Sequence, residues 1–368
     1  MKNKNKKPFD FWIFASVILL LSLGTIMVFS SSYYSAVNKF GESYHFLIPQ
    51  LMYMALSIAI LIVTANFDYR RFGKLSPLLL MASVGLLILV LIVGDKINGA
   101  RRWLFIAGQS VQPSEIAKIA LIMFLSFSLS KRKEVLQSYF KGLLPYLMLI
   151  GLVAGLVLVE PHLSGALIIV ITGCIILFCA GAKISHFVVM AVPGVIAVVG
   201  AIVAAPYRFD RIKAWIDPFG NKLDEGWQIV NSLLAIGSGG LFGRGLGKSM
   251  QKYLYIPEPY NDYIFSILAE ELGFFGCVFV MLLFLVFIWR GIKVAMNAPD
   301  VFGSLMATGI TSLIGLQFLF NVAVVTNSIP STGISLPFFS YGGTSLMFLM
   351  IGVGILLNIS RFSNYERF

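Results

Sequence analysis

The chain has 368 residues, of which 58% are hydrophobic and only 12% charged, and its mean hydropathy is +0.87. Soluble domains carry roughly a quarter charged residues, so this composition excludes a soluble globular protein. The net charge of +11 does not indicate nucleic acid in such a chain, because basic cytoplasmic loops facing anionic lipid account for it. The apolar runs are continuous rather than alternating, which excludes a membrane β-barrel and predicts an all-α polytopic integral membrane protein.

Hydropathy and charge together predict about ten transmembrane helices, because a membrane span needs about 20 apolar residues. The residues left over suffice for short loops and one large extracytoplasmic loop, 206–261, between spans seven and eight. No second domain fits, so residues 1–368 are expected to form a single membrane domain. The predicted spans are 11–30, 46–65, 77–94, 114–130, 143–159, 163–182, 185–205, 263–289, 302–325 and 341–359.

The distribution of lysine and arginine predicts the orientation of these spans. With the N-terminus inside, more than half of the basic residues fall in cytoplasmic segments, among them the N-terminal lysines and the run 131–133. The positive-inside rule therefore places both termini in the cytoplasm. One short outer loop departs from the rule, since it carries Lys96, Arg101 and Arg102. An anionic ligand would explain positive charge on that side.

Charged residues in or beside the predicted spans are the next candidates for a functional site. Glu115 and Lys118 lie three residues apart on one face of the fourth span, where they can form an ion pair. That pair either locks the helix or lines a polar cavity in which Lys118 meets a pyrophosphate, and the sequence leaves both hypotheses open. Glu160, in EPHLSG between spans five and six, is either a proton-handling residue or part of a tight outer turn, and the turn is favoured.

The large outer loop contains two distinctive stretches. A mixture of basic and aromatic residues in PYRFDRIKAWIDPF predicts a short interfacial helix. The glycines of GSGGLFGRGLG allow close approach of the backbone to a partner, although the P-loop lysine pattern is absent. The last outer loop, NSIPSTGISLPFFSYGG, carries proline and glycine at intervals that predict a rigid non-helical segment beside a cavity.

The eighth span carries three polar residues at helical spacing. Asp262, Ser266 and Glu270 occupy positions i, i+4 and i+8, so they are expected to share one inward face, with Asp262 at the outer mouth. From the residues alone, an ordinary N-terminal helix cap is the favoured interpretation of Asp262. No group of histidine, cysteine and carboxylate residues has metal-ligand spacing, and nothing resembles a Ser-His-Asp or Cys-His arrangement.

Several segments in order along residues 9–362 resemble the SEDS family of shape, elongation, division and sporulation proteins. They are NGARRW, VQPSEIAK, EPHLSG, the run from GSGGLFGRG to PEPYNDYIFSILAEELG, and SIPSTGISLPFFSYGGTSL. The segments NGARRW and LGKSMQK resemble the FtsW and SpoVE branch more than RodA. The resemblance therefore favours a SpoVE-like sporulation member. The resemblance implies a ten-span enzyme of the bacterial cytoplasmic membrane that polymerises lipid II, working with a class B penicillin-binding protein.

The resemblance also implies roles for particular residues. Asp262 matches the aspartate that the family needs for polymerisation, Glu115 and Lys118 match residues lining its central cavity, and Arg101 and Arg102 match its outer arginines. Two departures stand out: His162 replaces the usual aspartate of the EPDLG segment, and Thr332 replaces a lysine common in division-type members. Any role of those two family residues is in doubt here.

The implied reaction assigns chemistry to these groups. A carboxylate at the outer surface is needed as general base for the attacking sugar hydroxyl, and Asp262 is placed for it. Fixed cations would stabilise the departing pyrophosphate, and a divalent cation, Mg or Mn, bound through the substrate could share that role. A lipid II flippase and a noncatalytic scaffold for the penicillin-binding protein remain the alternatives. The candidate cations are Arg101, Arg102, Lys118, Arg244, Lys248 and Lys252, and the further cavity candidates are Glu160, Ser266 and Glu270.

Overall fold

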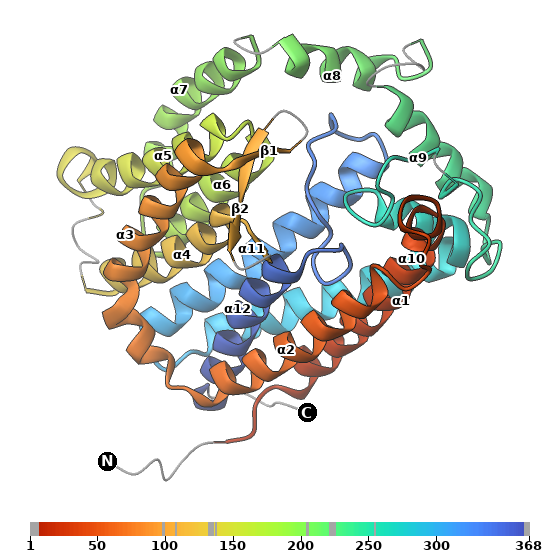
Figure 1. Ribbon diagram of the computed structural model, residues 1–368. Coiled ribbons are helices and arrows are strands. Elements are labelled where there is room, and N and C mark those ends of the chain that lie inside the picture. Colours follow the sequence, from red (N-terminus) through yellow and green to blue (C-terminus); the bar gives the residue numbers. More distant parts are fainter. Residues whose placement is uncertain are drawn as a thin grey trace.

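The computed structural model describes residues 7–363 apart from 98–99, 107–108, 132–135, 137, 204–205, 221–225 and 254. In this part of the chain, apolar helices pack into one bundle with a small sheet at one end (Figure 1). The helices are α1 (Phe11–Phe40), α2 (Leu47–Asn66), α3 (Tyr69–Val93), α4 (Pro113–Lys131), α5 (Leu144–Val159, after a π-helical turn, Tyr139–Leu143), α6 (Leu163–Cys179), α7 (Ile184–Val203), α8 (Pro206–Ile216), α9 (Gly226–Gly239), α10 (Ile264–Met296), α11 (Val301–Val325) and α12 (Gly343–Phe362).

Each of the ten predicted spans coincides with one helix, which confirms the polytopic helical fold. In the described part of the chain, eight helices are long and apolar enough to cross a membrane, and the shorter apolar α6 together with α7 matches the two remaining predicted spans. Helix α1 runs ten residues beyond the predicted end at residue 30 because its serines are accommodated inside the bundle. Ser31, for example, is buried and donates to the Val28 carbonyl one turn earlier.

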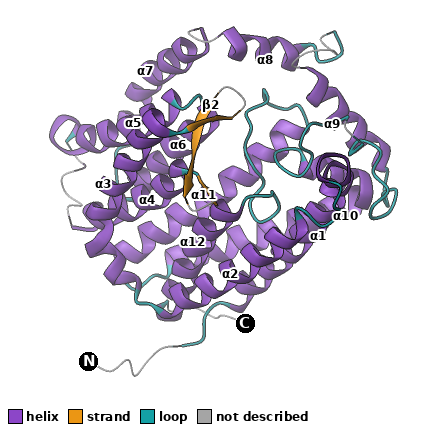
Figure 2. Cartoon of the chain, viewed as in Figure 1, coloured by secondary structure: helices purple, strands orange, loops and turns teal. Residues whose placement is uncertain are grey.

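The outer loop between α3 and α4 folds into a three-stranded antiparallel sheet rather than remaining irregular (Figure 2). Its strands are β1 (Asp95–Ile97), β2 (Ala100–Ile106) and β3 (Gln109–Val111), with Lys96 opposite Arg101 and Phe105 opposite Ser110. Thr344 at the start of α12 donates to the Ser110 carbonyl at 2.8 Å, which ties the sheet to the bundle. The first two residues of the NGARRW motif lie outside the described residues.

The predicted outer loop 206–261 contains two helices. The expected short helix is present as α8, and the apolar stretch before the glycines forms α9. Residues 221–225 and 254 of this loop lie outside the described part of the chain. The segment between α11 and α12 is non-helical, as its prolines and glycines predict, and it lies between the sheet and α9 (Figure 1).

A buried ion pair fixes the opposite end of the bundle. Asp10 and Arg290 are 0% and 4% exposed, and their closest nitrogen and oxygen atoms are 2.6 Å apart. Asp10 also caps α1 by accepting from the Ile13 amide, and its own amide donates to Ser360. Because an ion pair in such surroundings is stabilising only when its remaining hydrogen bonds are made, these contacts join α1, α10 and α12 at this end.

Helix α10 is broken at Gly273, and a neighbouring loop repairs the break. Gly273 has φ of +68° and ψ of −166°, so the helical hydrogen bonds on either side of it are interrupted. The carbonyls of Glu270 and Glu271 accept instead from the amides of Arg244 and Gly245, at 2.9 and 3.0 Å. In return, the amides of residues 274 and 275 donate to the carbonyls of residues 240 and 241. The loop after α9 therefore replaces the missing turn, as a bilayer requires of a broken span.

We predict that Gly273→Ala destabilises the protein by about 1–3 kcal/mol, because a side chain strains this φ and ψ and would collide with the backbone of Gly243. Thermal unfolding of the detergent-solubilised protein measures this. Gly151→Ala is the matched control, since a methyl group there meets nothing within 4 Å. Equal melting temperatures for the two variants would contradict the prediction.

Candidate functional site

Asp262 lies in the turn that precedes α10 and does not cap that helix. Helix α10 begins at Ile264, its N-cap position is Tyr263, and no side chain forms a capping hydrogen bond there. The interpretation of Asp262 as an ordinary cap is therefore wrong, and so is the expected helical face shared with Ser266 and Glu270, because the helix begins two residues too late. The Asp262 side chain is partly exposed at the end of the bundle that carries the sheet.

Asn321 of α11 holds the Asp262 turn against the loop that follows α11. Its Nδ2 donates to the backbone carbonyls of Asp262 and Ile334, both at 2.7 Å. Ser340 adds a second link by donating to the Asn261 carbonyl at 2.9 Å. Gly333, with φ of +70°, lies so close that an added methyl group would be 3.3 Å from Asp262 Oδ2. Two segments distant in sequence thus form one wall around the carboxylate.

Two arginines influence the Asp262 carboxylate from other elements. Arg102 of β2 donates from Nε to the Glu160 carbonyl at 2.9 Å and from its terminal nitrogen to the Pro161 carbonyl. Arg211 of α8 donates to the Ser331 carbonyl at 3.4 Å. Burial raises the pKa of Asp262 to about 6, with a smaller contribution from Glu258, while the positive charges of Arg102 and Arg211 act in the opposite direction.

The EPH turn between α5 and α6 lies beside Arg102, and the predicted turn is confirmed. Glu160 is fully buried at the end of α5, and among the described residues its carboxyl oxygens have no hydrogen-bond partner. Burial raises the pKa of Glu160 to about 8, against the opposing charge of Arg102. Burial also lowers the pKa of His162 to about 3, with Arg102 and Lys118 acting in the same direction, so this imidazole is neutral at physiological pH.

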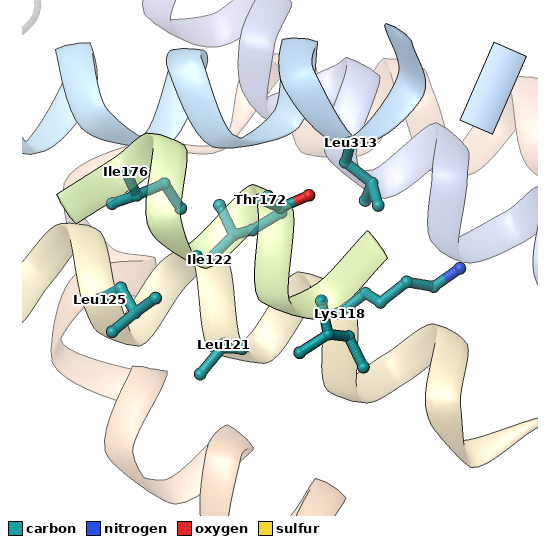
Figure 3. Close-up of a pocket in the computed structure, with 9 residues that line it drawn as sticks. Lys118, Leu121, Ile122, Leu125, Thr172, Ile176 and Leu313 are labelled. Carbon is teal, nitrogen blue, oxygen red and sulfur yellow. The ribbon is translucent and has the colours of Figure 1, made fainter. Parts of the chain in front are cut away.

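Glu115 and Lys118 form the predicted ion pair, with Lys118 Nζ 2.7 Å from Glu115 Oε1 and both side chains largely buried. The stem of Lys118 lines a cavity of about 10 Å³ between α4, α6 and α11, which also touches Thr172 and Leu313. Figure 3 shows the amino group pointing away from the apolar end of this cavity. Such a volume holds about one water molecule, so this cavity is not a substrate site.

Ser266 and Glu270 lie deeper in α10 and have partners in the fold. Ser266 Oγ is 2.7 Å from Ser232 Oγ of α9. The carboxylate of Glu270 is fully buried and accepts from the amides of Met250 and Gln251 at 2.9 and 3.2 Å. Arg244 lies 3.7 Å from the same carboxylate. The structure therefore places Glu270 and Arg244 at the contact between the glycine-rich loop and α10, and Ser266 at the contact between α9 and α10.

Lys252 is buried in the same contact. Its amino group donates to Glu271 at 2.9 Å, to the Gly247 carbonyl at 2.7 Å and to Ser30 at 3.3 Å. Arg101 is exposed on β2 and donates to the carbonyls at the end of α3, at 3.1 Å for Leu91. The structure thus relates Arg102 to Asp262 and to the EPH turn, places Lys118 where its charge acts on His162 of that turn, and gives Lys252 an intramolecular partner.

The sequence analysis missed two contributors. Arg211 was visible as a basic residue of the interfacial helix, but nothing in the sequence indicates that α8 turns it toward Asp262. Asn321 lies in the middle of an apolar span, and a buried amide there is a signal of a polar contact that hydropathy alone ignores. Among the described residues, no group of three or more histidine, cysteine or carboxylate residues could hold a metal ion.

This arrangement suits a carboxylate that exchanges a proton beside a bound anion. Asp262 is half-buried and has a pKa close to neutrality, so its carboxyl can exchange a proton near neutral pH, as a general base requires. Arg102 of β2 and Arg211 of α8 supply positive charge that acts on it from two different elements. Positive charge so placed can stabilise an anionic leaving group in surroundings from which water is partly excluded.

Comparison with known proteins places the whole chain in one group. Residues 11–365 match the FtsW, RodA and SpoVE model, described as "Cell cycle protein". The chain is 43% identical to Stage V sporulation protein E of Bacillus subtilis, covering 99% of this chain and all of that protein. It is 38% identical to a "Probable peptidoglycan glycosyltransferase FtsW" of a Geobacter species, covering 96% of each chain.

Two solved structures are similar over nearly the whole length. One, described as "Structural coordination of polymerization and crosslinking by a peptidoglycan synthase complex", has a TM-score of 0.80 and 28% identity, and covers 96% of this chain and 98% of that chain. The other is the rod shape determining protein RodA of Thermus thermophilus, with a TM-score of 0.72 and 28% identity, covering 97% of this chain and 98% of that chain.

We predict that the Asp262 carboxyl is half ionised near pH 6 and that Arg102→Gln raises this midpoint, because the guanidinium favours the ionised form. Infrared difference spectra between the wild type and Asp262→Asn across a pH series report the midpoint. Arg101→Gln is the control, since Arg101 donates to the end of α3 instead. A midpoint near the ordinary aspartate value, unchanged in Arg102→Gln, would contradict this description.

Proposed function

The chain belongs to the FtsW, RodA and SpoVE family of cell cycle proteins, and we propose that it is a peptidoglycan glycosyltransferase that polymerises lipid II. The observation that carries the proposal is the position of Asp262. Its side chain makes no helix cap, lies partly exposed, and is flanked by Arg102 and Arg211. A residue needed only for helix stability would form the cap.

In the proposed reaction, Asp262 is the catalytic residue and acts as general base. Lipid II carries a disaccharide-peptide joined to a polyprenyl chain through a pyrophosphate. The 4-hydroxyl of one sugar loses its proton to Asp262 and attacks the anomeric carbon of another, and the bond from that carbon to the pyrophosphate breaks. Because a hydroxyl is a poor nucleophile, such a base contributes about 10²–10⁴-fold to the rate.

The departing pyrophosphate needs positive charge, and the proposal assigns that role to Arg102, Arg211 and Lys118. The hydrogen bonds of the two arginines shown above run to backbone carbonyls, which hold the guanidinium groups in place. Lys118 shares its charge with Glu115. Arg244 and Lys252 support the glycine-rich loop instead, because their charges meet Glu270 and Glu271. A divalent cation, Mg or Mn, would enter with the substrate phosphates.

The setting of the enzyme follows from the same proposal. Both termini lie in the cytoplasm, so Asp262 faces the outer surface of the bacterial membrane, where the polyprenyl chain remains in the bilayer. A class B penicillin-binding protein is the proposed partner, supported by the likeness to a structure described as a peptidoglycan synthase complex. The identity with Stage V sporulation protein E supports a role in sporulation, with cell division as the other candidate.

A flippase and a pure scaffold are the competing functions. A scaffold gives no reason for a carboxylate that caps no helix and on which the charges of two arginines act. A flippase would need a polar path through the bundle, but Glu270 binds the amides of the glycine-rich loop and Lys118 lines a cavity the size of one water molecule. The positions of these two charges therefore favour the polymerase.

We predict that Asp262→Asn abolishes glycan formation from labelled lipid II by the purified protein with its penicillin-binding partner. In the wild type, the rate should rise with pH through about pH 6, because the base acts only when its carboxyl is ionised. Gel analysis of the glycan products measures both effects. Asp210→Asn, an exposed carboxylate of α8, is the control. Equal product from Asp262→Asn would remove this residue from the chemistry.

We predict that Asn321 is a positioning residue, and that Asn321→Leu lowers kcat by about 10- to 100-fold with little change in KM. The Asn321 amide donates to both the Asp262 and the Ile334 carbonyl, and a leucine can donate to neither. The pH midpoint of the rate should shift as well, which a loss of stability alone would not produce. Asn297→Ala, which removes a contact to the local Lys293 carbonyl, serves as control. Unchanged kcat and pH profile would contradict this role.

A further inference from the structure

The glycine-rich segment that repairs the break in α10, residues 240–250, lies at a particular depth relative to the membrane. We call this segment the glycine loop. Helix α10 has 33 residues but is broken at Gly273, so only the part after the break can be compared by helical rise with the roughly 30 Å of hydrocarbon in a bilayer. The other end of its span is marked by exposed Trp289, with the ammonium of Lys293 4.0 Å from its ring centroid. Aromatic and basic residues of this kind occupy the membrane interface.

Counting residues along α10 from Trp289 places Gly273, where the glycine loop contacts the helix, inside the bilayer. Gly273 lies sixteen residues from Trp289, or about 24 Å, which is less than the hydrocarbon thickness. The glycine loop is hydrogen-bonded to α10 on both sides of Gly273. The loop is therefore at the level where acyl chains meet headgroups, in the leaflet nearer Asp262, and not in the aqueous space outside.

The side chains of the loop continue the lipid-facing surface of α10. The rings of Phe242 and Phe275 are in contact, with centroids 5.2 Å apart, and Phe275 packs against Phe274. Phe242 is 79% exposed, which is a high value for a phenylalanine in water. A contiguous apolar patch of this kind indicates a membrane or protein contact. Its exposed members are Leu241, Phe242, Leu246, Met250, Phe274 and Phe275.

A positive charge lies at the edge of this patch. Lys248 is exposed within the glycine loop, and among the described residues it forms no ion pair. Arg244 in the same loop is partly exposed and partly neutralised by Glu270 at 3.7 Å. Apolar side chains beside an exposed lysine are typical of segments that insert at the interface of anionic lipid.

We propose that the glycine loop is inserted in the outer leaflet, with its apolar side chains among the acyl chains and Lys248 bound to the phosphate of an anionic phospholipid. The continuity of Phe242 with the lipid face of a spanning helix favours lipid over a protein partner. The consequence is that the loop seats the short outer half of α10, and with it the Asp262 turn, at a fixed height above the bilayer. The surface is separate from the residues proposed for catalysis.

Spin-label accessibility tests the depth. A nitroxide is attached at position 242 in a chain whose cysteines Cys174, Cys179 and Cys277 are replaced by alanine, and the protein is reconstituted into vesicles of phosphatidylglycerol and phosphatidylethanolamine. Power saturation compares collisions with oxygen, which is soluble in lipid, and with a water-soluble nickel chelate. Labels at Phe279 on the lipid face of α10 and at exposed Glu42 between α1 and α2 are the two references.

The label at 242 should behave like the label at 279, with oxygen dominating. A nickel accessibility equal to that at 42 would overturn the insertion and leave the patch free for a protein partner. A second label at Leu246 reports the same loop in case substitution of Phe242 disturbs it. Neither measurement depends on glycan formation, so failure of the proposed enzyme activity would leave the result standing.

Hydrogen exchange tests the headgroup contact. The wild type in nanodiscs of phosphatidylglycerol should exchange the amides of residues 241–250 several-fold more slowly than in nanodiscs of phosphatidylcholine. Lys248→Gln should remove this difference, while Lys213→Gln, an exposed lysine of α8, should retain it. Equal exchange of the wild type in both lipids would show that Lys248 binds no anionic headgroup, and would reduce the proposal to apolar insertion alone.

Discussion

The need to pair every backbone group inside a bilayer governs the half of this molecule that carries Asp262. The break in α10 at Gly273 would leave carbonyls and amides without partners in the hydrocarbon region, a cost of several kcal/mol. The loop after α9 supplies those partners through its own backbone. The short part of α10 before Gly273 is thereby held by a second chain segment. The turn with Asp262 directly precedes this part of the helix.

Two adjacent carboxylates complete that support. Glu270 accepts from backbone amides of the loop, while Glu271 accepts from Lys252, Ser30 and the Ser249 amide. Buried carboxylates of this kind are tolerated because each meets several donors. The charged residues of this region thus fall into two groups. One group neutralises itself inside the fold, and the other, Arg102 and Arg211, acts on Asp262.

The region around Asp262 is assembled from elements that are far apart in the chain. Arg102 comes from a strand, Arg211 from an interfacial helix, and Gly333 from the connection between α11 and α12. Asn321 joins two of these segments with a single amide group. Flexible outer loops can hold groups in a defined geometry only when the helices beneath them are fixed, and the ion pair of Asp10 with Arg290 fixes the opposite end.

The sequence by itself determined the spans, the ion pair of Glu115 with Lys118 and the non-helical segment after α11, and it singled out Asp262 as a candidate, because hydropathy, helical spacing and long motifs are local properties. Only the tertiary structure decided which charges meet. Asp262, Arg244 and Lys252 all lie near glycines or helix ends in the sequence. In the fold, Lys252 is buried and donates to Glu271, whereas the charges of two arginines act on Asp262. The spacing of residues could not reveal these partners, because they come from other parts of the chain. The loop after α9, for example, meets α10 only because the helix is broken at Gly273.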